Sequence, residues 1–445
     1  MIEIAKSIGA LLATLNGGSA IQSGPLTLEE AIGIAQRNAF AVRIQQSVIE
    51  KDRQKLNESR SNLGPQISLG ANYTRYGQET TANFGGANVV LQPIDTKTAN
   101  ATLTLPIDIS GNRSRLVSAA KSTRRSSELS LNATYSDTRL AVRQAYFAVL
   151  RAKALIEVDT KALDDAKGRL DQGQKQFDQQ QVAKLDVTRY KAQVAQSNAD
   201  LIAAKDNLTL ATYALNLALA RPIETPVTAV DVTELPAVEP TESDLVSAAQ
   251  ASRPEVLALT ENLHALASIR RATEQGMNPT LNFQLQHSRT IDPQGFSSTS
   301  QTNTGTLLLN IPIFDSGVTR AKVKEARQDE TQAKISLEQT KLQISQEVRS
   351  AIANLTSAKA RLENATEQVG LAAEVFRLAK VRQDAGAGTY YEVIDAEAQL
   401  TLARNGEVGA RYDYLTSYSQ LQRAVGSDDV AAAVASMTKS PKGGK

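Results

Sequence analysis

Two carboxylates, Glu392 and Asp395, are the pair of side chains best spaced for acid–base chemistry in this sequence. They stand three positions apart, so a helix would place them on one face. Paired carboxylates become catalysts when a buried cleft shifts their pKa values. These two follow the turn that ends a very long helical pattern, and the tip of a helix hairpin offers no such cleft. The pair therefore does not predict an enzyme.

Other reactive or metal-binding residues are scarce. The 445-residue chain has no cysteine, and its two histidines, His264 and His287, have no metal-ligand spacing around them. No nucleophile–base pair is visible, so we expect no metal and no cofactor. The 49 basic and 47 acidic side chains give a net charge of +2, and no strong field would attract nucleic acid.

The elements that must position the two carboxylates occur twice in the sequence. Residues of the first half recur 206 positions later without a gap, and the recurring pairs include Pro106 and Pro312, Gly111 and Gly317, Asp186 and Glu392, and Val187 and Val393. Upstream the offset rises to 214 and 215, which places about nine extra residues between Pro65 and Pro106. The chain is therefore a duplicated unit.

Each half reads as a helix, two strands, a very long helix and a further helix. Thr27 and Glu30 form a capping-box pattern, and the helix that follows is expected over residues 28–63; its copy runs from about residue 243 to 278. The very long helices are expected at residues 112–179 and 318–385. At a rise of about 1.5 Å per residue, each would be about 100 Å long, which favours slender packed helices over a globule.

Four segments alternate between apolar and polar residues, as β-strands with one apolar face do. They are residues 66–74, 101–109, 281–286 and 307–313, and the stretches between paired strands, residues 77–96 and 292–304, read as loops. Each strand is about long enough to cross a bilayer at a tilt. Four strands cannot close a barrel, which needs about eight, so a membrane-spanning sheet would require several chains.

The sequence predicts five parts. Residues 1–25 are expected to be an export signal or a disordered N-terminus, because a short apolar run precedes small residues there. Residues 26–220 form the first repeat, residues 221–242 a proline-rich linker, and residues 243–426 the second repeat. Residues 427–445 are expected to be a disordered tail.

Three motifs, in their order within the duplicated plan, resemble the TolC family of outer membrane channel proteins. They are Thr27-Leu28-Glu29-Glu30-Ala31 at the first helix, Pro312-Ile313-Phe314-Asp315-Ser316-Gly317 after the last strand, and Gly388-Thr389-Tyr390-Tyr391-Glu392-Val393-Ile394-Asp395-Ala396 after the last long helix. The resemblance covers roughly residues 26–426.

The resemblance implies a mainly α fold with a β membrane part. Three chains would form a homotrimer whose twelve strands make one β-barrel in the lipid of the outer membrane, continuous with a periplasmic α-helical coiled-coil barrel. Such a protein is the passive exit channel of a tripartite efflux pump or a type I secretion system. It docks onto a periplasmic adaptor (membrane fusion) protein and an inner membrane transporter, and it is not an enzyme.

The resemblance also assigns a pore gate at the periplasmic aperture. In the family an acidic ring narrows this end of the tunnel, and Glu392 and Asp395 occupy the matching positions. Asp186 is the first-copy equivalent of Glu392, whereas Arg189 replaces the second acid and could bridge to Asp395 or Glu392. The alternative is that these are ordinary solvated helix charges. Gly388 stands where the family's best-known latch has an arginine, so the closing contacts are not carried over.

Two further sets of residues follow from the repeated plan. The expected adaptor-contacting helix tips are Gln181, Val182, Ala183 and Lys184 in the first copy, and Gly386, Ala387, Gly388 and Thr389 in the second. The expected strand-to-helix junctions carry Pro106, Gly111, Pro312 and Gly317.

A soluble or filament-forming periplasmic coiled-coil protein is the alternative interpretation. It would share the long helices and the lack of catalytic motifs, but it would not need four alternating strands with an apolar outer face. The transported substrate is not encoded, because a duct passes what its partners deliver.

Overall fold

The computed structural model describes residues 24–232, 242–291, 293 and 300–427. The predicted export signal and tail therefore lie almost wholly outside the described residues, as does part of the linker. The residue contacts divide the chain into two units, and each unit draws on both sequence halves. The sheet unit comprises residues 44–133 and 250–345. The tip unit comprises the described residues within 1–43, 134–249 and 346–445.

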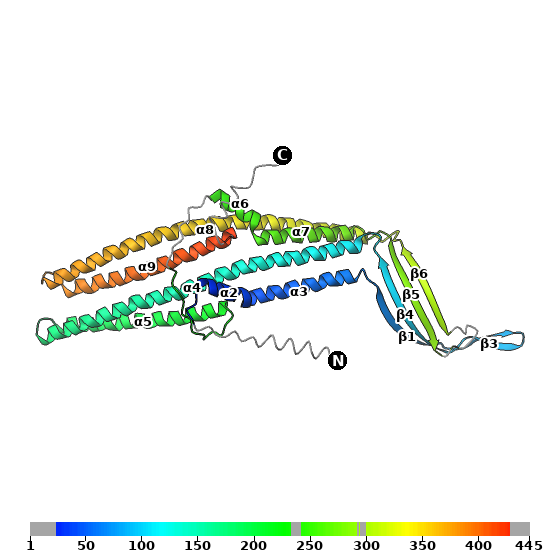
Figure 1. Ribbon diagram of the computed structural model, residues 1–445, viewed down its shortest axis with the longest axis horizontal. Coiled ribbons are helices and arrows are strands. Elements are labelled where there is room, and N and C mark those ends of the chain that lie inside the picture. The colour runs from blue at the N-terminus through cyan, green and yellow to red at the C-terminus, as the bar shows by residue number, and fades with distance from the viewer. Residues whose placement is uncertain (1–23, 233–241, 292, 294–299, 428–445) are drawn as a thin grey trace. The chain divides into compact units, whose positions relative to one another are not determined.

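Four antiparallel strands form the sheet of the sheet unit (Figure 1). They are β1 (Gln66–Arg75), β4 (Asp95–Ile107), β5 (Thr280–Ile291) and β6 (Gln301–Asn310), in the spatial order β1-β4-β5-β6. The register aligns Ile67, Leu103 and Leu285 in one row and Ser68, Thr102 and Gln286 in the next. One face is therefore apolar and the other polar. Four strands are present as predicted, but their bounds differ: β4 begins at residue 95 rather than 101, β5 continues to residue 291, and β6 spans residues 301–310 rather than 307–313, so the predicted loop at residues 292–304 includes the start of β6.

The stretch between β1 and β4 is not simply the predicted loop. It contains a hairpin of β2 (Thr80–Phe84) and β3 (Ala87–Gln92), which pair with each other in a separate two-stranded sheet. Gly85 and Gly86 have φ values of 62° and 93°, as a two-residue hairpin turn with positive φ at both positions requires. The hairpin was not predicted because its many polar residues leave no clear alternation of apolar and polar side chains.

Four helical segments pack within the sheet unit. α3 (Phe40–Ser61) and α7 (Pro254–Thr273) lie against the first part of α4 (Asn112–Asp178), where Ser127 Oγ donates to Asp52 Oδ2 at 2.6 Å and Ser126 Oγ donates to the Ala258 carbonyl at 2.8 Å. α7 also contacts α8 (Val318–Asp384), since Arg270 Nε lies 2.8 Å from Glu330 Oε2. The long helices start and end within one residue of the predicted positions.

The two helices predicted at residues 28–63 and 243–278 are each interrupted once. The first one divides at Ala39, whose ψ of 136° is extended, into α2 (Leu28–Asn38) and α3. Its copy divides at Arg253, with a ψ of 131°, into α6 (Glu242–Ser252) and α7. Pro254 explains the second break, because proline disfavours the helical conformation of the preceding residue. The two breaks occupy matching positions of the repeats, but the first has no proline to mark it.

The tip unit contains two helix hairpins. The second part of α4 is followed by α5 (Lys184–Ala218), and the second part of α8 is followed by α9 (Tyr390–Val425). The predicted capping box is present, since Thr27 Oγ1 accepts from the Glu30 amide at 3.3 Å and Glu30 Oε2 accepts from the Thr27 amide at 3.0 Å. In the described part of the chain, none of the helices combines the length and apolar character needed to cross a bilayer.

Candidate functional site

The two predicted helix tips have the same backbone geometry. After α4, Gln180 has a φ of 60°, and the Gln181 amide donates to the Gln176 carbonyl at 2.8 Å. After α8, Gly386 has a φ of 71°, and the Ala387 amide donates to the Arg382 carbonyl at 2.9 Å. Both are left-handed helix ends that satisfy the last carbonyls. The first copy achieves this turn without glycine.

The second tip is closely packed around Gly388. A Cβ atom on Gly388 would lie 3.0 Å from both Arg382 Cβ and the Gln383 amide nitrogen, which is closer than side chains normally approach. The Gly388 amide also donates to the Arg382 carbonyl at 3.0 Å. A side chain at position 388 would therefore require Arg382 and the backbone at Gln383 to shift by a few tenths of an ångström.

The residues predicted to contact an adaptor mostly face solvent. Six of them are exposed and two are partly buried; the exposed ones are Gln181, Ala183, Lys184, Gly386, Ala387 and Thr389, and the others are Val182 and Gly388. The two tips are therefore largely exposed to solvent.

The predicted gate acids Asp186 and Glu392 have local roles in their helices. Asp186 Oδ2 accepts from the Ala183 amide at 3.3 Å, and its other oxygen lies 3.8 Å from Arg189 Nη1. The Glu392 amide donates to Thr389 Oγ1 at 3.3 Å, and its carboxylate lies 3.8 Å from Arg382 Nη2. Each acid sits in the first turn of its helix, where the helix dipole favours negative charge.

Asp395 differs from the other acids. It is exposed one turn beyond Glu392, and among the described residues no ion pair or hydrogen bond involves its carboxylate. The expected bridge from Arg189 to Asp395 or Glu392 does not form within one chain. Instead the Arg189 guanidinium pairs with Asp186 and lies 6.0 Å from the centre of the Tyr391 ring. Of these charges, only that of Asp395 has no counter-charge within the described residues.

An aromatic clasp, which sequence reasoning missed, joins the two hairpins just above the tips. Tyr190 on α5 and Tyr390 on α9 meet edge to face, with their ring centres 6.0 Å apart. Tyr390 Oη donates to Gln176 Oε1 on α4 at 2.9 Å. Burial is the main cause that raises the pKa of the Tyr190 hydroxyl to about 12. Here the clasp means Gly173, Gln176, Tyr190 and Tyr390.

Gly173 makes room for the clasp. A Cβ atom at this position would lie 2.6 Å from Tyr190 Cε2. In the second repeat the equivalent residues are Ala379 and Ala396, which pack together in a buried cluster with Val393. A glycine faces a tyrosine in one copy, and an alanine faces an alanine in the other. Aligning the two halves and comparing side-chain sizes would have found this pair.

A buried ion pair lies one turn further from the tips. Arg169 on α4 pairs with Glu397 on α9, and the two side chains are only 18% and 8% exposed. The Arg169 guanidinium also lies 5.3 Å from the centre of the Phe376 ring on α8. Burial lowers the pKa of Arg169 below its usual range. The pair ties three helices together. The other repeat lacks the pair, because Arg169 corresponds to Val375 and Glu397 corresponds to Lys191.

A groove of about 630 Å³ lies between α4, α5 and α9 beside this ion pair. Asp159 lies in it, is 7% exposed, and accepts from Asn405 Nδ2 at 3.4 Å. Burial raises the pKa of the Asp159 carboxyl, and the charge of Asp200 across the groove raises it further. Among the described residues, no three acidic or histidine side chains gather in a way that could hold a metal ion.

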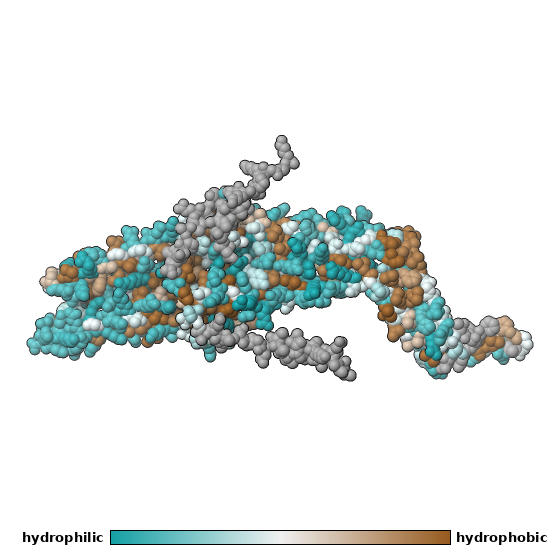
Figure 2. Space-filling view, viewed as in Figure 1, coloured by the Kyte–Doolittle hydropathy of each residue, from teal (hydrophilic) through white to brown (hydrophobic). Residues whose placement is uncertain are grey.

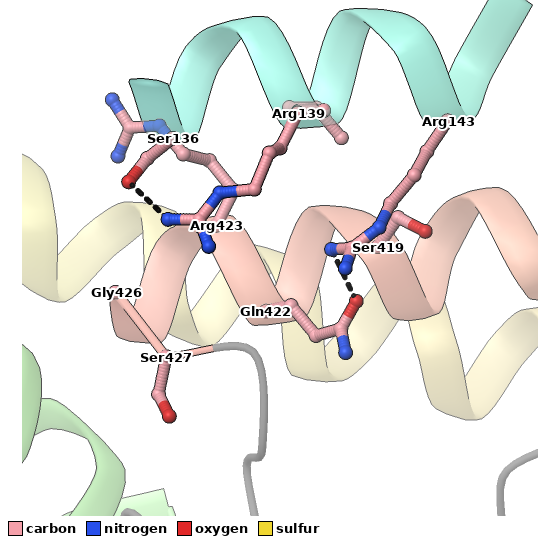
Figure 3. A pocket seen from close by; sticks show the side chains of 9 residues that line it. Ser136, Arg139, Arg143, Ser419, Gln422, Arg423, Gly426 and Ser427 are labelled. Carbon is pink, nitrogen blue, oxygen red and sulfur yellow. Dashed lines mark hydrogen bonds between the residues drawn. The ribbon is translucent and has the colours of Figure 1, made fainter. Parts of the chain in front are cut away.

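A second polar cluster lies at the other end of α9 (Figure 3). Figure 3 shows the hydrogen bond that Arg143 Nη1 donates to Gln422 Oε1, at 2.7 Å. Arg423 Nε also donates to Asp137 Oδ1 at 2.5 Å, so both contacts join α4 to α9. The cavity among these side chains has a volume of only about 10 Å³, which is room for about one water molecule. The cluster is therefore a brace between helices rather than a ligand site.

The strand-to-helix junctions lie in the sheet unit. Gly111 and Gly317 have φ values of 70° and 88°, so each supplies the left-handed residue before its long helix. Asp315 accepts from the amides of Gly317 and Thr319 at 3.0 and 2.7 Å. Hydrogen bonds from Thr319 are the main cause that holds the pKa of Asp315 below its usual range. Pro106 lies within β4, opposite Asn282, whereas Pro312 follows the end of β6.

Comparisons with known proteins agree with this arrangement. The family model described as outer membrane efflux protein matches residues 31–221 and 245–427, once in each repeat. The cobalt-zinc-cadmium resistance protein CzcC of Cupriavidus metallidurans is 24% identical, with 90% of each chain covered. The outer membrane protein TolC of Escherichia coli is 25% identical, with 86% of this chain and 79% of that protein covered.

The fold agrees as well. The crystal structure of the outer membrane channel CmeC of Campylobacter jejuni superposes with a TM-score of 0.76 at 18% identity, covering 93% of this chain and 89% of that one. A crystal structure of CusC gives a TM-score of 0.77 at 18% identity, covering 92% and 96%. Because the family model covers most of both repeats, the chain belongs to the outer membrane efflux protein family and is an outer membrane efflux channel of the TolC type.

Proposed function

We propose that three copies of this chain form one continuous exit duct. The observation that carries the proposal is the four-stranded sheet, in which β1 and β6 each pair on one side only within the described residues. Unpaired strand edges in lipid cost several kcal/mol per unsatisfied group, so a sheet in a membrane must close. Three sheets of four strands would supply the twelve strands of a closed barrel.

The helices of the tip unit would then continue the duct into the periplasm. The family's role as a transport conduit decides against the soluble coiled-coil alternative and against an enzyme. A tripartite pump or a type I secretion system also needs a periplasmic adaptor and an inner membrane transporter. In the proposal the adaptor docks on the tips around Gln181 and Ala387, because both residues are exposed at turns whose backbone carbonyls are already satisfied.

The proposed gate is a ring of carboxylates at these tips. Three copies of Glu392 and Asp395 would line the aperture, and Asp395 has no partner within the described chain that would neutralise it. Rings of carboxylates favour cations and resist close approach of the chains. Arg189 of one chain would pair with Asp395 of the next in the closed aperture, and Asp186 would orient Arg189 through the contact at 3.8 Å.

The duct itself would have little substrate selectivity. Its relatives include a protein named for cobalt, zinc and cadmium resistance as well as TolC, so similar ducts serve different transport systems. We expect the inner membrane transporter to choose the substrate.

Ion selectivity in planar bilayers tests the gate. The double variant Glu392→Gln/Asp395→Asn should lower the preference for potassium over chloride several-fold, because it removes six carboxylates from a trimer's aperture. The matched control is Asp206→Asn, an exposed acid on α5. Unchanged selectivity in the double variant, with normal insertion, would remove these acids from the gate.

Crosslinking tests the docking surface. A photoreactive residue at Gln181 or Ala387 should capture the channel's periplasmic adaptor, whereas one at exposed Lys324 on α8 should not. Capture at Lys324 alone would place the adaptor elsewhere.

A further inference from the structure

We propose that the groove between α4, α5 and α9 is a binding site for a small organic cation, namely a protonated amine with an apolar body. The site consists of Asp159 on α4, Ser197 and Asp200 on α5, and the apolar walls beside them. All the lining residues belong to the tip unit of a single chain. The inference therefore does not depend on the assembly of the duct.

The groove contains two carboxylates without a counter-charge. Asp159 is buried and accepts a long hydrogen bond, of 3.4 Å, from Asn405 Nδ2. Asp200 is exposed and accepts from Gln196 Nε2 at 2.9 Å. Within the described ranges, no lysine or arginine pairs with either carboxylate. Burial raises the pKa of Asp159, and repulsion from Asp200 adds to this effect. A cation between the two carboxylates would offset both penalties.

The other charged side chains that line the groove are already paired. Arg151 is the lining residue of α4 furthest from the tips, and its Nη1 atom lies 3.4 Å from Asp413 Oδ1. Glu397, the lining residue of α9 nearest the tips, pairs with Arg169. The net negative charge of the groove therefore comes from the two carboxylates between these pairs.

Ser197 is an independent indication of a ligand. Its side chain is only 5% exposed and lines the groove, and its hydroxyl makes no hydrogen bond to any described residue. Ser118 and Ser130 on α4, by contrast, each donate to the carbonyl four positions earlier. A buried hydroxyl without a partner is unfavourable. Ser197 and Asp200 stand three positions apart and share one face of α5, so a group held by the carboxylate can also reach the hydroxyl.

The acceptors of the groove favour a protonated amine over a metal ion. In the part of the chain that the structure describes, no cluster of three acidic or histidine side chains could hold a metal. An ammonium group carries three N–H donors, which match two carboxylates and one hydroxyl. The site therefore has the acceptors for the charged end of an amine.

The walls of the groove suit an apolar body attached to that amine. The apolar side chains that line it are Leu155, Ala162, Ala203, Ala204 and Leu402. Figure 2 shows that hydrophobic patches interrupt the mainly hydrophilic surface of the helices in the tip unit. The volume of the groove, about 630 Å³, lies within the range of small-molecule sites, about 300–1,000 Å³.

Calorimetric titration of the purified full-length channel in uncharged detergent tests the site, with naphthylmethylamine as the probe. The variant Asp159→Asn/Asp200→Asn should bind this amine about tenfold more weakly than the wild type or worse, because a hydrogen bond to a charged group contributes about tenfold or more to a binding constant. Ser197→Ala, which removes a neutral acceptor, should weaken binding about fivefold. The matched control, Asp206→Asn, removes an acid of α5 outside the groove and should bind normally.

Two further arms separate the outcomes. Naphthylmethanol, a neutral probe of similar shape, should bind the wild type and the double variant equally and more weakly than the amine binds the wild type. Circular dichroism checks that each variant is folded, and Ser197→Ala decides the question if the double variant unfolds. Equal binding of the amine to the wild type and the folded variants would overturn the inference. So would a wild type that shows no saturable binding, as when a neighbouring chain fills the groove, or that binds the alcohol as tightly as the amine.

Discussion

Gly173 and Tyr190 set the spacing between α4 and α5 near the tips. The variant Gly173→Ala would place a methyl group 2.6 Å from the present position of Tyr190 Cε2, so the ring must move and its contact with Tyr390 is lost. Overpacking of this kind costs about 1–3 kcal/mol. We expect a lower unfolding midpoint by circular dichroism, together with more frequent channel openings.

Gly168 provides the control for this substitution. It lies on the same helix with nothing within 4 Å of a built Cβ atom, so Gly168→Ala should stabilise the helix by about 0.5–1 kcal/mol. Wild-type stability of Gly173→Ala would show that the clasp is looser than the structure describes.

Asp159 is a residue whose charge the fold disfavours. Burial raises the pKa of Asp159 above its value in the unfolded chain. The protonated carboxyl therefore makes its full contribution to the free energy of unfolding at low pH, and this contribution is lost as the pH rises through the folded-state pKa. Asp159→Asn imitates the protonated form and keeps an acceptor for Asn405. We expect it to raise the melting temperature at pH 7 and to have no such effect near pH 3.

The control for Asp159 is Asp206→Asn, which removes an exposed acid from α5. It should not change the melting temperature at pH 7 or near pH 3. A stabilisation by Asp159→Asn that is equal at both pH values would mean that the carboxylate's charge is not its cause.

Among the elements, α4 and α9 depend on the Arg169–Glu397 pair for their contact near the tips. Glu397→Gln would leave the Arg169 guanidinium buried without its counter-charge. Breaking a buried pair in this way costs about 3–5 kcal/mol, whereas replacing both partners by apolar residues is often neutral. Chemical unfolding should therefore give a smaller loss for Arg169→Met/Glu397→Met than for Glu397→Gln. The reverse order would contradict the burial of the pair.

The start of α8 depends on Asp315. The pKa of Asp315 is lower in the folded chain than in the unfolded chain. Asp315 therefore contributes to the free energy of unfolding at pH values above its unfolded-state pKa, and this contribution is lost as the pH falls through the folded-state pKa. Asp315→Ala should lower the melting temperature at pH 7, and the difference from the wild type should shrink toward pH 3. Asp329→Asn, an exposed acid further along α8, is the control and should show no such pH dependence.

The sequence predicted the elements whose signals are local. Thr27 and Glu30 mark the start of α2 because a capping box is a contact between neighbours in the chain, and Gly386 marks the end of α8 because its positive φ suits glycine. The break at Ala39 and the hairpin of β2 and β3 were missed, since neither has a proline or an apolar alternation. The break at Arg253 was missed although Pro254 marks it. The clasp was missed because Gly173 and Tyr190 meet only through side-chain size across two helices.

At the scale of the whole molecule, the two repeats are alike in backbone and different in side chains. Both tips end in the same left-handed turn, although one uses Gln180 and the other Gly386. The clasp, the buried ion pair and Arg189 break the symmetry between the repeats. A homotrimer built from such chains would have alternating, unequal contacts around its tip, which is what an aperture needs if some contacts open while others hold.

The measurement that tests the central claim most directly is reconstitution of the purified full-length chain, with its mass and its conductance determined on the same sample. The account predicts particles with the mass of three chains, and discrete conductance steps in planar bilayers, one for each inserted trimer. A stable monomer that never inserts, or trimers that leave the bilayer without conductance, would contradict it.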